Sequence, residues 1–427
     1  MMLNLLYNLS IHGYSFIISL LAPFNSKAKL WIDGRKDIFI RLKSAIGQQN
    51  SQQKTAWFHC ASLGEFEQGR PVIEAFRAKY STYKILITFF SPSGFEVRKN
   101  YSSGTPQRAE YIFYLPTDTP ENARKFIEIV KPSIAFFIKY EFWRNYLSEL
   151  KKNEIPVISF SAIFRPNQLF FKSYGSFYRQ VLKEFDHILV QNQESFDLLQ
   201  SIDIQAITLA GDTRFDRVKQ IVDGKQDIQI AKDFKANRSI FMIGSAWQTD
   251  LEVLIPFINS LKNDTNIAFV IAPHEIHREE IFAWQKQIQT PSICFSEVKP
   301  ETQLIDYQVL IIDNIGMLSS LYQHADYAFI GGSFGKGLHN ILEAATFEMP
   351  IFFGNKAYHK FQEANDLIRL GGAFSVASTD DMLLIFNELH INKAKKTQAA
   401  KVCRNYVLSN VGATEKVLKI VDLILND

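Results

Sequence analysis

The feature that most constrains the fold is an alternation of short apolar runs with amphipathic stretches, which occurs twice along the chain. The runs in the first half are TAWFHCAS, YKILITFF, AEYIFYLP, PSIAFFIK, IPVISFSA and HILVQN. Those in the second half are SIFMIGSA, NIAFVIAP, YQVLIID, ADYAFIGGS and MPIFFGN. Apolar runs of this length, with helical patterns between several of them, are typical of βαβ units. The sequence therefore predicts α/β domains with parallel sheets.

A polar interval over residues 216–239 separates the two series of apolar runs. The chain has 427 residues, which exceeds the size at which a single hydrophobic core keeps growing. We predict two Rossmann-like domains, residues 27–218 and residues 219–427, and we leave open whether the last helix crosses back to the first domain. Such pairs of domains face each other across a cleft and bind ligands at the carboxyl ends of their strands.

The composition excludes several classes of function. Lys and Arg number 47 against 44 Asp and Glu, a mildly basic balance that favours acidic surfaces or ligands without indicating nucleic acid. Because aromatic and basic residues do not interleave as in RNA-binding domains, we expect no nucleic-acid partner. Cys60, Cys294 and Cys403 are widely separated, without CxxC spacing. They predict neither a disulfide framework nor a cysteine metal site, and they fit a reducing compartment.

The amino-terminal stretch is a candidate for membrane association. Its first 24 residues contain no Asp, Glu, Lys or Arg, and basic residues follow at once: Lys27, Lys29, Arg35 and Lys36. It lacks the basic region and cleavage site of a removable signal peptide, and polar residues interrupt it, which weakens the case for a full span. We predict a retained anchor or interfacial helix over residues 1–26, with an ordinary buried helix as the alternative. The basic cluster suits an anionic cytoplasmic leaflet, so the rest of the chain is expected in the cytoplasm.

The most specific pattern in the second half is the glycine-rich segment YAFIGGSFGKGLHNILEAA. Its glycines let the backbone approach a ligand, and a helix expected to begin near His339 offers free N–H groups to a phosphate. Asn340 and Glu343 share a face of that helix, where Glu343 can accept both hydroxyls of a ribose. The segment is neither a Walker loop nor a GxGxxG motif. It predicts a nucleotide site, with a glycine turn and a dipole-complementing carboxylate as the alternative.

Two neighbouring strand ends are expected to point into the same site. One presents Pro273 and His274, and the other presents a turn at residues 314–317 whose backbone groups can read a base edge. The sequence HEIH at residues 274–277 superficially suggests a metal site. It is not HExxH and no third ligand is apparent, so we predict no metal.

In the first half, the stretch HCASLGEFEQGRP places Glu65 after the first clear strand. We predict that it lies on a strand-to-helix loop, with Pro71 near the first turn of the helix. There it can take a proton from an attacking hydroxyl, and its alternative role is a helix-end charge worth ~0.3–1 kcal/mol. Glu141 follows another strand end, and Arg214 can neutralise a departing phosphate or a substrate carboxylate. Surface ion pairs are the alternative for both.

In this order, the motifs resemble those of the 3-deoxy-D-manno-octulosonic acid (Kdo) transferases, membrane-associated glycosyltransferases of lipopolysaccharide synthesis. The matching stretches are the amino-terminal anchor, HCASLGEFEQGRPVIEAFR, KYEFWRNYLSELKKNEIPVISFSA, GDTRFD, IAPHE, DNIGMLSSLYQHADYAFIGGS and GLHNILEAA. The resemblance implies a GT-B fold with an N-terminal membrane-associated helix, at the cytoplasmic face of the inner membrane. It implies inverting transfer of Kdo from CMP-Kdo to a lipid A precursor (lipid IVA), without metal or other cofactor. Another GT-B enzyme, a UDP-sugar transferase or an epimerase, is the alternative.

The resemblance also implies a role for individual residues. Glu65 falls on the catalytic base, while Glu141 and Arg214 fall on positions that stabilise the transition state. The nucleotide-binding positions are Pro273, His274, Ile315, Gly316, Met317, Asn340, Ile341, Leu342 and Glu343. The chain departs from the family pattern at four positions: Lys139 and Met317 replace Glu, His274 replaces Arg, and Arg214 replaces Lys. The changes at His274 and Met317 remove a positive and a negative group from the expected nucleotide site.

Overall fold

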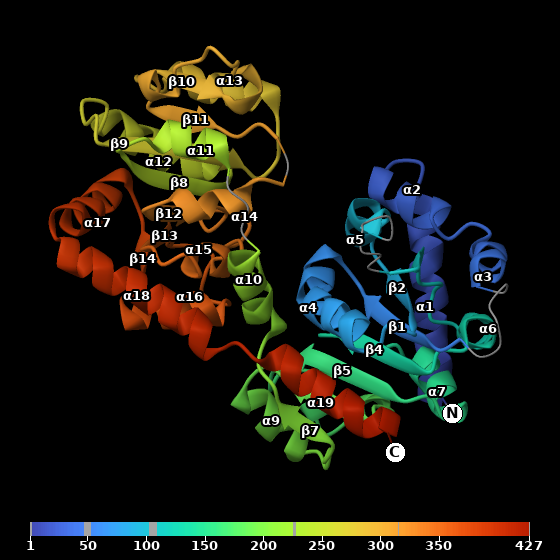
Figure 1. Ribbon diagram of the computed structural model, residues 1–427. Coiled ribbons are helices and arrows are strands. Elements are labelled where there is room, and N and C mark those ends of the chain that lie inside the picture. The colour runs from blue at the N-terminus through green and yellow to red at the C-terminus, as the bar shows by residue number, and fades with distance from the viewer. Residues whose placement is uncertain (1, 47–52, 102–108, 225–227, 315, 427) are drawn as a thin grey trace. The chain divides into compact units, whose positions relative to one another are not determined.

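The computed structural model describes residues 2–46, 53–101, 109–224, 228–314 and 316–426, and the chain forms two compact units (Figure 1). Unit 1 comprises Met1–Arg217 and Val411–Asp427, and unit 2 comprises Val218–Asn410. The chain leaves unit 1 within α10 (Thr213–Asp223) and returns to it before α19 (Ala413–Asn426). The last helix is therefore part of unit 1, where it packs against α4 (Leu63–Lys79).

Unit 1 contains a seven-stranded parallel sheet in the order β3-β2-β1-β4-β5-β6-β7. Its strands are β1 (Thr55–Cys60), β2 (Lys84–Phe89), β3 (Tyr111–Tyr114), β4 (Ile134–Ile138), β5 (Val157–Ala162), β6 (His187–Val190) and β7 (Ile207–Leu209). The predicted strands of the first half are confirmed, and β7 is an additional short edge strand. Because the chain moves outward from β1 in one direction and from β4 in the other, the topological switch point lies between β1 and β4.

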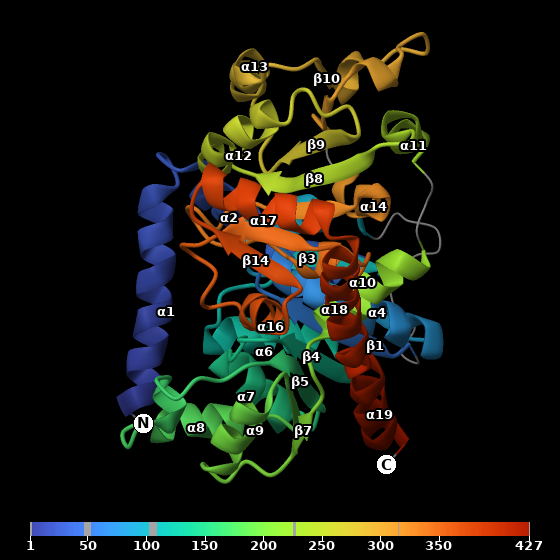
Figure 2. The same ribbon diagram turned by 90° about the vertical axis from the view of Figure 1, so that its left-hand side faces the viewer.

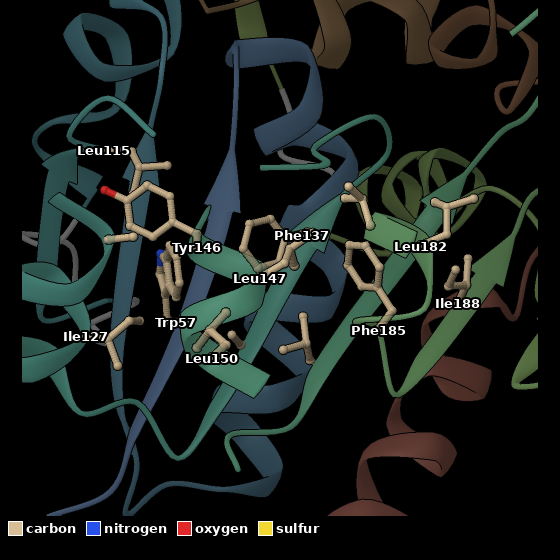
Figure 3. Close-up of a cluster of buried hydrophobic side chains, with 14 of the residues drawn as sticks. Trp57, Leu115, Ile127, Phe137, Tyr146, Leu147, Leu150, Leu182, Phe185 and Ile188 are labelled. Carbon is tan, nitrogen blue, oxygen red and sulfur yellow. The ribbon is translucent and has the colours of Figure 1, made fainter. Parts of the chain in front are cut away.

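Both faces of this sheet are covered by helices. On one face, α4 and α19 contribute Val72, Ile73, Val417 and Val421 to the core. On the other, Trp57 of β1 packs against Tyr146 at a ring-centroid distance of 5.7 Å (Figure 3). The remaining helices of unit 1 are α1 (Met2–Leu21), α2 (Ser26–Asp33), α3 (Ile38–Ile46), α5 (Pro92–Arg98), α6 (Pro120–Val130), α7 (Arg144–Lys152), α8 (Ser176–Leu182) and α9 (Gln193–Gln200).

Unit 2 contains a second parallel sheet in the order β10-β11-β9-β8-β12-β13-β14. Its strands are β8 (Ser239–Ala246), β9 (Ile267–Pro273), β10 (Ser292–Cys294), β11 (Val309–Ile311), β12 (Tyr327–Ile330), β13 (Ile351–Gly354) and β14 (Ala373–Val376). Its helices are α11 (Gln229–Lys235), α12 (Gln248–Ser260), α13 (Arg278–Gln287), α14 (Leu318–Leu321), α15 (Leu342–Ala345), α16 (Gln362–Leu370), α17 (Thr379–Ile391) and α18 (Lys393–Ser409). The predicted strands are confirmed, and the switch point lies between β8 and β12.

Figure 2 shows α1 as one long helix that begins at the N-terminus. Some of its polar side chains pair with other residues of unit 1, and many of its large apolar side chains are exposed. Tyr7 donates a hydrogen bond to Asp118 at 2.6 Å, and Asn8 accepts one from Asn145 at 2.9 Å. No residue of α1 is buried, so it is not the ordinary buried helix of the alternative prediction. Its exposed large apolar residues include Leu3, Leu5, Leu6, Leu9, Phe16, Ile17, Leu20 and Leu21. This is the reverse of the usual amphipathic helix on a globular domain.

None of the helices that the structure describes, α1 included, is long and apolar enough to cross a membrane.

Candidate functional site

Glu65 lies at the switch point of unit 1, in the first turn of α4. The prediction of a strand-to-helix loop is wrong, because α4 already begins at Leu63 and Pro71 lies inside the helix. Ser62 caps the helix, and its backbone N–H donates to the Glu65 carboxylate at 2.9 Å, which forms a capping box. Glu65 therefore has the helix-end role that was its alternative, and this role fixes the orientation of its carboxylate beside the strand ends.

The environment of Glu65 changes its acidity. The pKa of Glu65 is raised to about 7, first by burial and then by the charge of Glu141, against the opposing effects of the Ser62 amide and Lys139. A carboxyl group whose pKa lies near neutrality is suited to take up and release a proton at neutral pH. The helix-end role by itself would lower this pKa, so burial beside a second carboxylate distinguishes Glu65 from a plain capping residue.

Glu141 follows β4, on the other side of the same switch point, and is buried. Its Oε2 atom lies 3.0 Å from Nε2 of His59, and Trp143 donates to it from Nε1 at 2.5 Å. His59 is a fully buried residue of β1, and its Nδ1 atom lies 2.9 Å from the hydroxyl of Thr88 on β2. Glu141 is therefore a carboxylate held by a side chain of β1 and a side chain that follows β4, rather than a surface ion pair.

Arg214 lies at the start of α10 and pairs with Asp212, which is buried, so the pair is not the surface ion pair of the alternative prediction. The Arg214 side chain donates from Nε to Asp212 Oδ2 at 2.7 Å, and its backbone N–H donates to Oδ1 at 2.9 Å. Asp212 is buried and also accepts from Gln68 Nε2 at 2.8 Å. Burial raises the pKa of Asp212, but the Arg214 charge and these hydrogen bonds outweigh it and hold the pKa below its usual value. The guanidinium is thus oriented by an ionised carboxylate while keeping 30% of its side chain exposed.

In unit 2, the glycine-rich loop after β12 is closely packed. A Cβ atom at Gly331 would lie 2.2 Å from the carbonyl oxygen of Ser245, and one at Gly332 would lie 2.3 Å from that of Gly337. Gly332 also has φ +94°, a conformation that other residues rarely adopt. Its N–H donates to the buried carboxylate of Asp250 at 2.8 Å. This amide of the loop is therefore already occupied and does not face a phosphate.

Burial raises the pKa of Asp250 to about 6, against the opposing amides of Gly332, Trp247 and Phe334. The prediction that a helix begins near His339 is also wrong, because α15 begins at Leu342.

Three stacked rings meet at the carboxyl ends of β8 and β9 and in the glycine-rich loop. The ring of His274 lies between those of Trp247 and His339, at centroid distances of 4.5 and 4.2 Å. Trp247 donates from Nε1 to Nε2 of His339 at 2.8 Å, which leaves Nδ1 of a neutral His339 as its N–H donor. The ammonium of Lys336 lies 4.1 Å from the Trp247 ring centroid.

These rings are neutral at pH 7. Burial lowers the pKa of His339 to about 4, with a further contribution from His274, and burial also lowers the pKa of His274. Lys336 therefore supplies positive charge beside the stack. The sequence singled out His274 but not Trp247, Lys336 or His339 as ligand-contacting residues, although a strand end followed by Trp was a usable signal.

Most of the other predicted nucleotide-binding residues that the structure describes lie on α15 or in the turns before α14 and α15. Glu343 accepts from Asn340 Nδ2 at 3.2 Å and from the Ser319 hydroxyl at 2.5 Å, which joins α15 to α14. Gly316 has φ +101° with open space beside it, and Met317 precedes α14. The side chains of two further positions are fully buried and do not face a ligand: Ile341 and Leu342. Pro273 ends β9, and Ile315 lies outside the described residues.

Within the described part of the chain, no three His, Cys, Asp or Glu residues are grouped so as to hold a metal ion. His277 of the HEIH sequence instead lies 3.2 Å from Glu275, and both side chains are exposed.

Comparison with known proteins shows which family the chain is similar to. Residues 37–217 match the family model described as 3-deoxy-D-manno-octulosonic-acid transferase (kdotransferase). The 3-deoxy-D-manno-octulosonic acid transferase of Rickettsia bellii is 23% identical over 392 residues, which is 91% of this chain and 91% of the relative. The chain is thus similar to Kdo transferases over most of its length, and residues 37–217 match their family model. The corresponding protein of Aquifex aeolicus is 24% identical over 356 residues, 81% of this chain and 90% of the relative. The relatives and the family model support a glycosyltransferase, as the resemblance implied.

Solved structures agree with the GT-B fold expected of a Kdo transferase. The UDP-GlcNAc 2-epimerase of Neisseria meningitidis, bound to UDP-GlcNAc, has a TM-score of 0.63 at 16% identity and covers 87% of this chain and 100% of its own. MurG of Acinetobacter baumannii has a TM-score of 0.53 at 12% identity, covering 87% and 99%. At this identity the likeness concerns the fold alone, and it confirms two parallel-sheet α/β domains of GT-B type.

Proposed function

We propose that this glycosyltransferase transfers Kdo from CMP-Kdo to a lipid A precursor, lipid IVA, with inversion at the anomeric carbon. Similarity to Kdo transferases supports the identity of the sugar, and the chemistry of unit 1 supports the residue roles. The observation that carries the proposal is Glu65, a carboxyl group with a pKa near 7 at the switch point of the family-matched domain. Such a group can accept a proton from a sugar hydroxyl at neutral pH.

In the proposed reaction, Glu65 removes the proton of an acceptor hydroxyl while the hydroxyl oxygen attacks the anomeric carbon of Kdo. The bond from that carbon to the phosphate oxygen breaks, and CMP leaves with the electron pair. Glu141, held by His59 and Trp143, stabilises the positive charge that develops on the sugar ring. Arg214 stabilises negative charge in the transition state.

We assign CMP to the carboxyl ends of the unit 2 strands. Lys336 beside the Trp247 ring neutralises the phosphate, since a single phosphate group carries limited charge and does not demand a metal ion. Glu343 accepts the ribose hydroxyls, and the backbone of the turn at Gly316 reads the base. We expect no further cofactor and no nucleic-acid partner.

We propose that α1 lies in the surface of the inner membrane, on its cytoplasmic face. Many of its exposed side chains are large and apolar, and three lysines follow it closely: Lys27, Lys29 and Lys36. An interfacial helix buries such a face at the lipid boundary while basic residues contact anionic headgroups. Co-sedimentation with vesicles tests this, and we expect stronger binding to vesicles that contain anionic lipid than to neutral ones.

Donor preference separates this function from its main alternative. In calorimetric titrations of the purified enzyme, CMP should bind and UDP should bind more weakly. Tighter binding of UDP would favour a UDP-sugar transferase or an epimerase. The product test is mass spectrometry of lipid IVA after incubation with CMP-Kdo, where each transferred Kdo adds one mass increment.

A further inference from the structure

A cavity of about 390 Å³ opens in unit 1 between α1 and loops that follow β2, β3 and β4. Its wall includes Ile11, Tyr14, Phe90, Thr117, Asp118 and Trp143. Trp143 also donates to Glu141 at 2.5 Å, so the cavity adjoins the carboxylate network of the proposed active site. Its size falls within the range of small-ligand sites in proteins.

Most polar groups of this wall, apart from the Tyr14 hydroxyl, are paired within the protein. Asp118 accepts from Tyr7 at 2.6 Å and from the backbone N–H of Tyr146 at 3.0 Å. The hydroxyl of Thr117 accepts from the Asn122 side chain at 3.0 Å. Ser10 also lines the cavity, and it donates to the carbonyl oxygen of Tyr7 at 2.6 Å. A sugar would have to give up its hydrogen bonds with water to enter such a cavity, whereas a hydrocarbon chain has none to lose.

The remaining wall is aromatic and aliphatic. The rings of Phe90 and Trp143 lie 4.7 Å apart, and those of Tyr14 and Phe90 lie 6.0 Å apart, so the three rings form a continuous surface. Ile11 and Tyr14 belong to α1, which also exposes large apolar side chains such as Leu9, Phe16 and Ile17. A hydrocarbon chain that entered the cavity from a lipid surface at α1 would thus end beside Trp143, the hydrogen-bond partner of Glu141.

We propose that this cavity binds one hydrocarbon chain of the acceptor lipid and so presents the acceptor's hydroxyl to Glu65. The identity of the acceptor in this proposal rests on the proposed function. The cavity's preference for hydrocarbon is independent of that function. Each methylene group that leaves water for the apolar wall favours binding. The cavity therefore selects acylated acceptors over their deacylated forms.

Binding of a fluorescent fatty acid, 11-(dansylamino)undecanoic acid, tests the site without any transfer reaction. Ile11→Trp fills the cavity and should weaken binding at least tenfold. Ile391→Trp, the same exchange at an 82% exposed position on α17, should leave it unchanged. Equal affinity of Ile11→Trp and the unchanged protein would overturn the proposal, because the probe would then bind elsewhere, for example on the outer face of α1.

A second variant guards against misfolding of the first. Ile11→Ala enlarges the cavity, and it should shift the preferred fatty acid toward longer chains. An unchanged chain-length preference, in a variant that retains the thermal midpoint of the parent protein, would contradict the proposal.

Transfer assays separate this inference from the proposed function. Ile11→Trp should raise KM for lipid IVA at least tenfold and leave kcat/KM for a deacylated acceptor unchanged. An equal loss with both acceptors would assign the cavity to the sugar part of the acceptor and overturn a hydrocarbon site. If the unchanged enzyme transfers Kdo to neither acceptor, the proposed function fails while the fatty-acid titration still decides the cavity's ligand.

Discussion

The raised pKa of Glu65 makes the pH dependence of transfer a quantitative test of its role. With a pKa of about 7, the ionised fraction of Glu65 is about one in eleven at pH 6 and about ten in eleven at pH 8. Because a general base must be ionised before it accepts a proton, kcat/KM should rise about tenfold over this interval and then level off.

Glu141→Gln is the perturbation that examines why the pKa of Glu65 is raised. The exchange keeps the size of the side chain and an oxygen that can accept from Trp143, but it removes the charge that raises the pKa of Glu65. The acid limb of the pH profile, over which kcat/KM rises with pH, should therefore move to lower pH. Burial still keeps the pKa of Glu65 above that of an exposed carboxylate. If the pKa of Glu65 falls by about one, the repulsion removed is about 1.4 kcal/mol, and the ionised fraction at pH 6 rises to about one half.

The assay is the release of CMP from CMP-Kdo, measured as kcat/KM from about pH 5 to about pH 9. Absolute rates of Glu141→Gln will be lower, so the midpoint of the acid limb is the quantity compared. Glu121→Gln is the matched control, because Glu121 lies on α6 and pairs with Lys125 at 2.7 Å. An acid limb at the same pH in Glu141→Gln and the unchanged enzyme would refute coupling between the two carboxylates.

Three further predictions concern stability and the nucleotide loop. The pKa of Glu65 is raised on folding, so its contribution to stability is present below about pH 4.5 and is lost as pH rises through about 7. In urea unfolding, Glu65→Gln should therefore be more stable than the parent protein at pH 8, by up to about 3 kcal/mol. Near pH 4 the two proteins should be equally stable. Gly332→Ala should abolish CMP binding in calorimetry, whereas Gly335→Ala, where the nearest atom to an added Cβ is 3.5 Å away, should retain it. Tyr7→Phe should lower the free energy of unfolding by about 1–3 kcal/mol, because it removes a donor to the buried carboxylate of Asp118.

Each of these has a contradicting outcome. A stability difference for Glu65→Gln that does not change with pH would mean that ionisation is not its cause. Normal CMP binding by Gly332→Ala would show that the loop tolerates a side chain there. Unchanged unfolding of Tyr7→Phe would show that α1 is not held through Asp118.

The sheets were predictable because buried parallel strands are encoded locally, as short apolar runs between turn residues. The strands that were missed, β7, β10 and β14, have only three or four residues each and carry no long apolar run. The position of Glu65 in α4 was also present in the sequence, since Ser62 followed three residues later by Glu65 is the pattern of a capping box. Pro71 was a misleading guide to the start of the helix.

The rest of the site depends on contacts between distant segments. Asp250 occupies an amide of the glycine-rich loop 82 residues away, and no local pattern indicates that pairing. The stack of Trp247, His274 and His339 likewise joins three segments that only the sheet order brings together. The absence of charge in α1 could be read from the sequence. Which face of the helix contacts the protein depends on the distant residues that it pairs with, Asp118 and Asn145 of α7.

The central claim, that Glu65 is the base for Kdo transfer, has one direct test. The purified enzyme and its Glu65→Ala variant are each incubated with CMP-Kdo and lipid IVA, and the mass of the lipid is measured by mass spectrometry. CMP binding to both proteins is measured by calorimetry. We predict Kdo-sized mass increments with the unchanged enzyme, none with Glu65→Ala, and the same CMP affinity for both. Near-normal transfer by Glu65→Ala would contradict the claim.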